Sequence, residues 1–216
     1  AVERPTGDRL LADHGARREL SQALTEAWHR LAADLRRRLP ASQILLQVDE
    51  PALLAVAHGE VPTASGFSRH RKVSAAEIAE ALRLLAPDAW LHCCAPGDWL
   101  DLAAQAGFQV AAIDTRNFQE PRCLDALATW AQEGRGLVAG VVDTSRHRSQ
   151  SADELVAEAL RVLRPLELSQ RALEQQILLG TACGMAGWPQ RSGTPQLTAL
   201  RGAAPLVAEA LAQQRR

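Results

Sequence analysis

Short apolar segments alternate with helical segments along almost the whole chain, and this alternation constrains the fold more than any other feature. The apolar segments predict buried parallel strands, because apolar and β-branched residues run through them with little polar alternation. They cover residues 43–49, 89–94, 109–114, 136–143 and 175–183. The segments between them are rich in Ala, Leu, Arg and Glu, and they predict helices. These helices cover residues 18–39, 74–86, 97–107, 123–134, 151–163 and 194–214.

The boundaries of the helices have their own signals. Two capping boxes are predicted at helix starts, formed by Ser74 with Glu77 and by Ser151 with Glu154. Gly107 and Gly134 stand at the ends of two predicted helices, where a left-handed residue often ends a helix. No linker or low-complexity segment interrupts the pattern, so we expect residues 1–216 to form a single α/β domain with a parallel sheet covered by helices on both faces.

Two architectures fit this pattern, a doubly wound open sheet and a (β/α)8 barrel. Five strands suffice for an open sheet and fall short of a barrel, which usually takes about 250 residues. Neither a G-x-G-x-x-G motif nor a phosphate-binding P-loop follows any predicted strand, which removes the usual nucleotide-binding arguments for an open sheet. Both architectures place their functional groups at the carboxyl ends of the strands.

The composition excludes several classes of function. A formal net charge of -1 gives no reason to expect nucleic acid or an anionic membrane surface as a partner. No apolar run approaches the roughly 18 residues of a membrane span. The four cysteines are too few and too unevenly spaced for a disulfide framework, so we expect a reducing, cytoplasmic location.

Each predicted strand ends in a titratable group or a thiol, and the densest cluster is His92-Cys93-Cys94. Side chains alternate along a strand, so His92 and Cys94 point to one face and Cys93 points to the opposite face. Cys183 is the only thiol at the end of another predicted strand, and Asp114 ends a strand between the two.

A histidine and two thiolates form a soft ligand set that suits Zn²⁺. We therefore predict a zinc site formed by His92, Cys94 and Cys183, with Asp114 placed to complete or outline it. The alternative is that these residues are ordinary core residues, because an H-x-C pair and one distant cysteine form a weak pattern. Cys123 opens a predicted helix and is expected to serve in packing.

Five motifs together resemble a known family. They are QVDEPAL (47–53), HCC (92–94), AAIDT (111–115), GVVD (140–143) and ACGMAGWP (182–189). In order and in strand position they resemble the catalytic domain of cobalamin-independent methionine synthase, and in particular its short, single-barrel members. The resemblance implies a (β/α)8 TIM-type barrel, of which this chain supplies about the last five βα units.

The resemblance also implies a zinc ligand set. His92, Cys94 and Cys183 resemble the family's H-x-C and C-G ligands. Asp114 stands where the family has a glutamate ligand in an I-E-T context, and its side chain is one methylene shorter.

Further residues resemble the family's substrate-binding and catalytic groups. Asp49, with Glu50 beside it in the Q-x-D-E-P-A pattern, resembles the carboxylate that holds the amino group of the amino-acid substrate. The family's catalytic histidine stands two residues after the aspartate of its G-V-Y-D-I-H motif, where this chain has Ser145. His147 lies two positions further on, and it would take this role if the loop is remodelled.

The implied function is zinc-dependent transfer of a methyl group to a thiol, most simply to homocysteine to give methionine. The donor would be 5-methyltetrahydrofolate or a methylcobalamin. Two alternatives stay open. One is a related zinc methyltransferase that acts on another thiol, such as coenzyme M, or uses another donor; the other is a degenerate barrel that binds zinc without turnover.

The family's first three βα units would precede Ala1. We therefore expect the chain to be a fragment or a processed product, and we expect the missing segment, a second chain or a dimer partner to cover the two open sheet edges.

Overall fold

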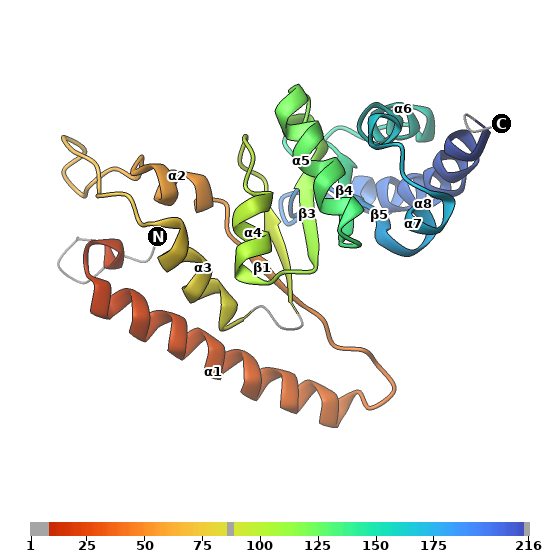
Figure 1. The fold of residues 1–216 in the computed structure, drawn as a ribbon. Coiled ribbons are helices and arrows are strands. Elements are labelled where there is room, and N and C mark those ends of the chain that lie inside the picture. The colour runs from red at the N-terminus through yellow and green to blue at the C-terminus, as the bar shows by residue number, and fades with distance from the viewer. Residues whose placement is uncertain (1–8, 86–88, 214–216) are drawn as a thin grey trace. The chain divides into compact units, whose positions relative to one another are not determined.

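The chain divides into two compact units in the computed structural model, which describes residues 9–85 and 89–213. Among these residues, the first unit holds 9–85, 89–91 and 102–109, and the second holds 92–101 and 110–213. Figure 1 labels the helices and strands of both units. The chain is an α/β protein in which helices follow each of five strands, as the sequence predicts.

The first unit is mainly helical. Its elements are η1 (Leu10–Ala12), α1 (His14–Arg38), β1 (Leu46–Asp49), α2 (Leu53–His58) and α3 (Ala75–Arg83), together with the start of β2 (Ala89–Cys93) and most of α4 (Leu100–Ala106). The helix α1 begins four residues earlier than the sequence predicts, because the Asp13 side chain accepts a hydrogen bond from the backbone N of Ala16 at 3.1 Å and caps it.

The second unit alternates strands and helices. After the last residues of β2 it contains β3 (Val110–Asp114), η3 (Thr115–Asn117), α5 (Pro121–Gln132), β4 (Gly136–Val142), α6 (Ala152–Leu163), η4 (Arg164–Leu166), α7 (Gln170–Gln176), β5 (Ile177–Thr181) and α8 (Gln190–Gln213). Within this unit β3, β4 and β5 are parallel neighbours in chain order, from green to blue in Figure 1. Their carboxyl ends therefore lie at one edge of the sheet.

The core of the second unit lies on β3, β4 and the helices that follow them. Four of the five residues of β3 are buried, and so are five of the seven of β4. The helix α6 contributes a buried face that includes Leu155, Ala159 and Leu163. The expectation that every strand is covered on both faces is wrong for β1 and β5, whose residues are half-buried or exposed. In β5 the reason is its position as the last strand of the sheet, and Leu178 is 52% exposed.

Both predicted capping boxes are confirmed, and the helices that they begin, α3 and α6, start directly after the predicted serine caps. In each box the serine accepts from the backbone N of the glutamate while the glutamate accepts from the backbone N of the serine. The two glycines at helix ends, Gly107 and Gly134, have φ values of 97° and 81°. The short helices α2 and α7 are not predicted from the sequence, and the end of the predicted helix 74–86 lies outside the described residues. No helix within residues 9–85 and 89–213 is long and apolar enough to cross a membrane.

Candidate metal centre

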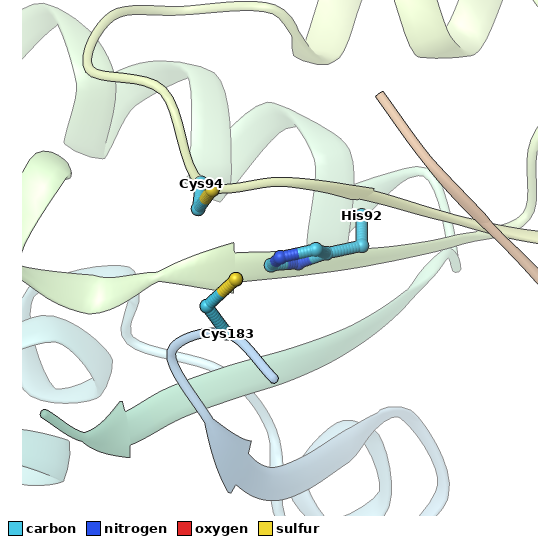
Figure 2. Close-up of side chains that lie close together, drawn as sticks. All are labelled: His92, Cys94 and Cys183. Atoms are coloured by element: carbon cyan, nitrogen blue, oxygen red, sulfur yellow. The ribbon is translucent and has the colours of Figure 1, made fainter. Parts of the chain in front are cut away.

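Three side chains from two chain segments converge at the carboxyl ends of β2 and β5. His92 is in β2, Cys94 follows that strand directly, and Cys183 follows β5 by two residues. One ligand atom of each lies within 4.8 Å of the other two, and Figure 2 shows the imidazole ring and the Cys183 sulfur side by side. The burial decreases across the group, from the buried His92 through the half-buried Cys94 to the exposed Cys183. The strand alternation that separates Cys93 from this group places it in the core, where it is fully buried.

The hydrogen bond of His92 fixes which ring nitrogen is available to a ligand. Its Nδ1 lies 3.0 Å from the carbonyl oxygen of Ala112 in β3. A carbonyl oxygen only accepts, so this bond places the proton on Nδ1 and leaves a lone pair on Nε2. The Nε2 atom is buried and has no hydrogen-bond partner within the part of the chain that the structure describes. A buried acceptor without a partner is costly unless a ligand occupies it, so Nε2 is available to coordinate a metal ion.

The spacing of the three ligand atoms suits a tetrahedral ion. With bonds of about 2.3 Å to sulfur and 2.0–2.1 Å to nitrogen, ligand atoms around Zn²⁺ stand about 3.5–3.8 Å apart. The ligand atoms lie within 4.8 Å of one another, so small side-chain movements would bring them to the spacing that the ion requires. The ligand set fits Zn²⁺ or a similar soft to borderline ion, and it leaves at least one of four tetrahedral positions without a protein ligand.

The 3-10 turn η3 holds the backbone around Cys94. The side-chain amide of Asn117 donates to the carbonyl oxygen of Cys94 at 2.8 Å. The thiol is not activated by this environment. Burial, followed by the charge of Cys183 and its hydrogen bond, raises the pKa of Cys94 above the usual value for a thiol, and the charge of Asp114 adds to this. The thiol of Cys94 therefore keeps its proton at neutral pH until a metal ion displaces it.

We expect binding of Zn²⁺ to displace one proton from Cys94. This displacement alone should raise the affinity for Zn²⁺ by about tenfold per pH unit between about pH 6 and 8. The sign follows from the raised pKa, because the competing proton stays bound throughout this range. Chelator competition at several pH values, corrected for the titration of the chelator, measures the slope. An affinity independent of pH would contradict the prediction.

Gly140 in β4 allows the backbone at the ends of the neighbouring strands β3 and β5 to lie close to its own Cα. A Cβ atom on Gly140 would lie 2.3 Å from the carbonyl oxygen of Ile113, 2.7 Å from the Cα of Ala182 and 2.8 Å from the carbonyl oxygen of Thr181. The pairing of β4 with β5 shifts its register between Gly140 and Val142, and the backbone N of Ala182 then donates to the carbonyl oxygen of Val142 at 2.9 Å. Only glycine fits here, and the residue that follows Ala182 is Cys183.

The loop after β4 carries His147 against the loop after β5. Two atoms of the His147 ring would lie 3.3 Å from a Cβ atom on Gly187, and the ring centroid is 6.1 Å from that of Trp188. The Trp188 Nε1 donates to the carbonyl oxygen of Thr144 at 3.2 Å, which ties the two loops together. His147 is exposed and has a φ of 50°, a left-handed conformation that costs a non-glycine residue about 1–2 kcal/mol. The structure thus places His147 beside the segment that follows Cys183.

Besides His147, three of the predicted site residues lie outside this group of ligands. Asp114 belongs to the same edge of the sheet, but among the described residues the group contains only the histidine and the two thiols. Asp49 and Glu50 belong to the first unit, where the Asp49 carboxylate accepts from the Gln47 side chain at 2.8 Å and burial raises the pKa of Glu50.

Comparison with known protein families identifies the chain. The model of the family described as "Cobalamin-independent synthase, Catalytic domain" matches residues 6–205. The chain belongs to this family. The match covers most of the chain, including every strand and the candidate metal centre. No curated protein matches the chain.

The likeness to solved structures shows the same fold. A B12-independent methionine synthase from Shewanella sp. W3-18-1, solved in complex with selenomethionine, has a TM-score of 0.61 and 17% sequence identity to this chain. The similarity covers 92% of this chain and 56% of that chain. The α/β alternation of this member of the synthase family is therefore that of a partial TIM-type barrel, as the motifs imply.

Proposed function

We propose that the protein transfers a methyl group to the thiol of an amino acid, with homocysteine as the acceptor and methionine as the product. The observation that carries this proposal is the convergence of His92, Cys94 and Cys183, together with the buried Nε2 of His92, which has no hydrogen-bond partner among the described residues. The family of the chain supports methyl transfer as the reaction class.

The metal ion in this proposal is Zn²⁺, held by the three side chains. Bound there, it would lower the pKa of a coordinated thiol and supply a thiolate that remains nucleophilic at neutral pH. In the reaction a bond forms between sulfur and the methyl carbon, the bond from that carbon to the donor nitrogen or cobalt breaks, and the thiol proton is released.

The remaining roles belong to the protein's own residues. The Asp49 carboxylate, with Glu50 beside it, would pair with the ammonium group of the acceptor and orient its sulfur. His147 would accept or relay a proton from its place beside Gly187 and Trp188. Asn117 would keep the Cys94 backbone in place through its hydrogen bond to the carbonyl oxygen.

The proposal is tested by offering zinc-loaded protein one acceptor thiol and one methyl donor at a time. Homocysteine, coenzyme M and 3-mercaptopropionate serve as acceptors, and 5-methyltetrahydrofolate and methylcobalamin serve as donors. We expect transfer to homocysteine with at least one donor. Transfer to coenzyme M alone would change the acceptor, and no transfer by a protein that holds zinc would overturn the proposed activity.

An Asp49→Asn variant sharpens this test. A charge-assisted hydrogen bond contributes about 1.5–3 kcal/mol, so its loss is expected to raise the KM for homocysteine by about 10- to 100-fold. The KM for 3-mercaptopropionate, which has no amino group, is expected to stay unchanged. Equal effects on both thiols would remove Asp49 from the amino-group site.

A further inference from the structure

The carboxylate of Asp114 is fully engaged by a neighbouring arginine. Arg116 donates from Nε to Oδ1 at 2.9 Å and from Nη2 to Oδ2 at 2.7 Å, and its backbone N donates to Oδ1 at 3.1 Å. Asp114 is 6% exposed, so water competes little for these bonds. This is the bidentate geometry in which arginine binds a carboxylate most strongly. To ligate a metal ion, Asp114 would have to give up part of this pairing.

The arginine is itself fixed from a second side. Its Nη1 forms an ion pair with Asp143, at the end of β4, and donates to the hydroxyl of Ser145 at 3.3 Å. Asp143 accepts in turn from the backbone N and the hydroxyl of Ser145, at 2.9 and 2.6 Å. The bridge Asp114–Arg116–Asp143 therefore joins the ends of two adjacent strands, and a carboxylate on either side holds the guanidinium in place.

Asp114 is nevertheless close to the candidate metal centre. It ends β3, whose Ala112 carbonyl oxygen orients His92, and its charge contributes to the raised pKa of Cys94 after burial and the neighbouring Cys183. Its oxygens are still not part of the group of ligand atoms, which among the described residues consists of the His92, Cys94 and Cys183 side chains. The carboxylate is near the site and turned toward the arginine.

We infer that Arg116 is a positioning residue that holds Asp114 out of the coordination sphere, so that the site binds its metal ion with three protein ligands and keeps a position for the acceptor thiol. This inference rests on the proposed function and specifies the ligand set of that same site. The charges favour this arrangement. A divalent ion with two thiolates and a neutral imidazole is neutral, and a further carboxylate ligand would make the site anionic before a substrate thiolate enters.

The test uses the purified protein loaded with Co²⁺, whose visible spectrum reports the number and type of ligands. In Asp114→Asn, with Arg116 intact, we expect the parent spectrum and an affinity for Co²⁺ within about threefold of the parent. Cys183→Ser provides the contrast, since it is expected to lose thiolate-to-cobalt intensity and to bind far more weakly. A changed spectrum in Asp114→Asn, or a loss of affinity clearly greater than threefold, would overturn the inference, because the loss of a ligand or of a group that orients one lowers metal affinity by about tenfold or more.

The role of Arg116 is tested by releasing the carboxylate. In Arg116→Met we expect Asp114 to reach the ion and to change the Co²⁺ spectrum, and in the double variant Arg116→Met/Asp114→Asn we expect the parent spectrum again. A parent-like spectrum in Arg116→Met, or a change that persists in the double variant, would remove the positioning role. If the parent protein binds no metal ion, the proposed function fails as well; if it binds one with a spectrum that depends on Asp114, the inference fails alone.

Discussion

Replacing His92 with alanine is expected to lower the affinity for Zn²⁺ by more than about 100-fold. Loss of a group that only orients a ligand lowers metal affinity by about 10- to 100-fold, and loss of one of three protein ligands should lower it further. The Nε2 atom of His92 is also buried without a hydrogen-bond partner among the described residues, so a bound ion would offset the cost of burying it. Metal content after dialysis and chelator competition measure the change.

Cys183→Ser separates ligand loss from damage to the fold. Cys183 is exposed, so its replacement removes a thiolate and little packing. We expect a similar loss of metal affinity while the thermal unfolding of the metal-free protein stays as in the parent. His29→Ala, an exposed histidine of α1, is the control and should bind the ion as the parent does. Metal binding within threefold of the parent in both ligand variants would contradict the site.

Replacing Gly140 with alanine is expected to lower the free energy of unfolding by at least about 3 kcal/mol, at the upper end of the range for overpacking. The added Cβ would meet three backbone atoms at 2.3–2.8 Å, and backbone atoms of paired strands have little freedom to move aside. Because two of these atoms belong to Thr181 and Ala182, the substitution should also displace Cys183 and weaken metal binding.

Denaturant unfolding of the metal-free protein measures this effect, and Gly202→Ala is the matched control. Gly202 lies on the exposed side of α8, and a Cβ atom there would meet nothing within 4 Å. Replacing an exposed helical glycine with alanine usually raises the free energy of unfolding by up to about 1 kcal/mol. If the two alanine variants unfold alike, the close approach at Gly140 is not the constraint that the structure indicates.

The sequence predicts elements well where a local signal acts alone. The helix α6 begins after the predicted Ser151 cap, because the capping box satisfies backbone donors with nearby side chains. The helix α8 begins at Gln190, four residues before the predicted start, since Pro195 is accommodated inside the helix and does not begin it. The helix α7 is not predicted, and only its last two residues fall within the predicted strand 175–183, although Ser169 caps the helix by accepting from the backbone N of Ala172.

The candidate site likewise contains residues that local sequence signals predict and residues that depend on the folded sheet. Strand alternation suffices to pair His92 with Cys94, and the end of the last strand suffices to select Cys183. The role of Arg116 could not be predicted, because it depends on two carboxylates from different strands that only the folded sheet brings within reach. Gly140 was also missed, although a glycine inside a buried strand often marks a close backbone approach.

The distance in sequence between the two thiols has a consequence for stability. Cys183 follows Cys94 by 89 residues, and the intervening chain contains the helices α5, α6 and α7 of the second unit. An ion bound by both sulfurs is a reversible cross-link that closes this long segment, and such a closure excludes many extended conformations of the unfolded chain. The free energy of unfolding then rises with the concentration of free metal ion, by about 1.4 kcal/mol for each tenfold increase once the site is saturated. The three side chains of the candidate metal centre would thus also stabilise the folded unit that carries them.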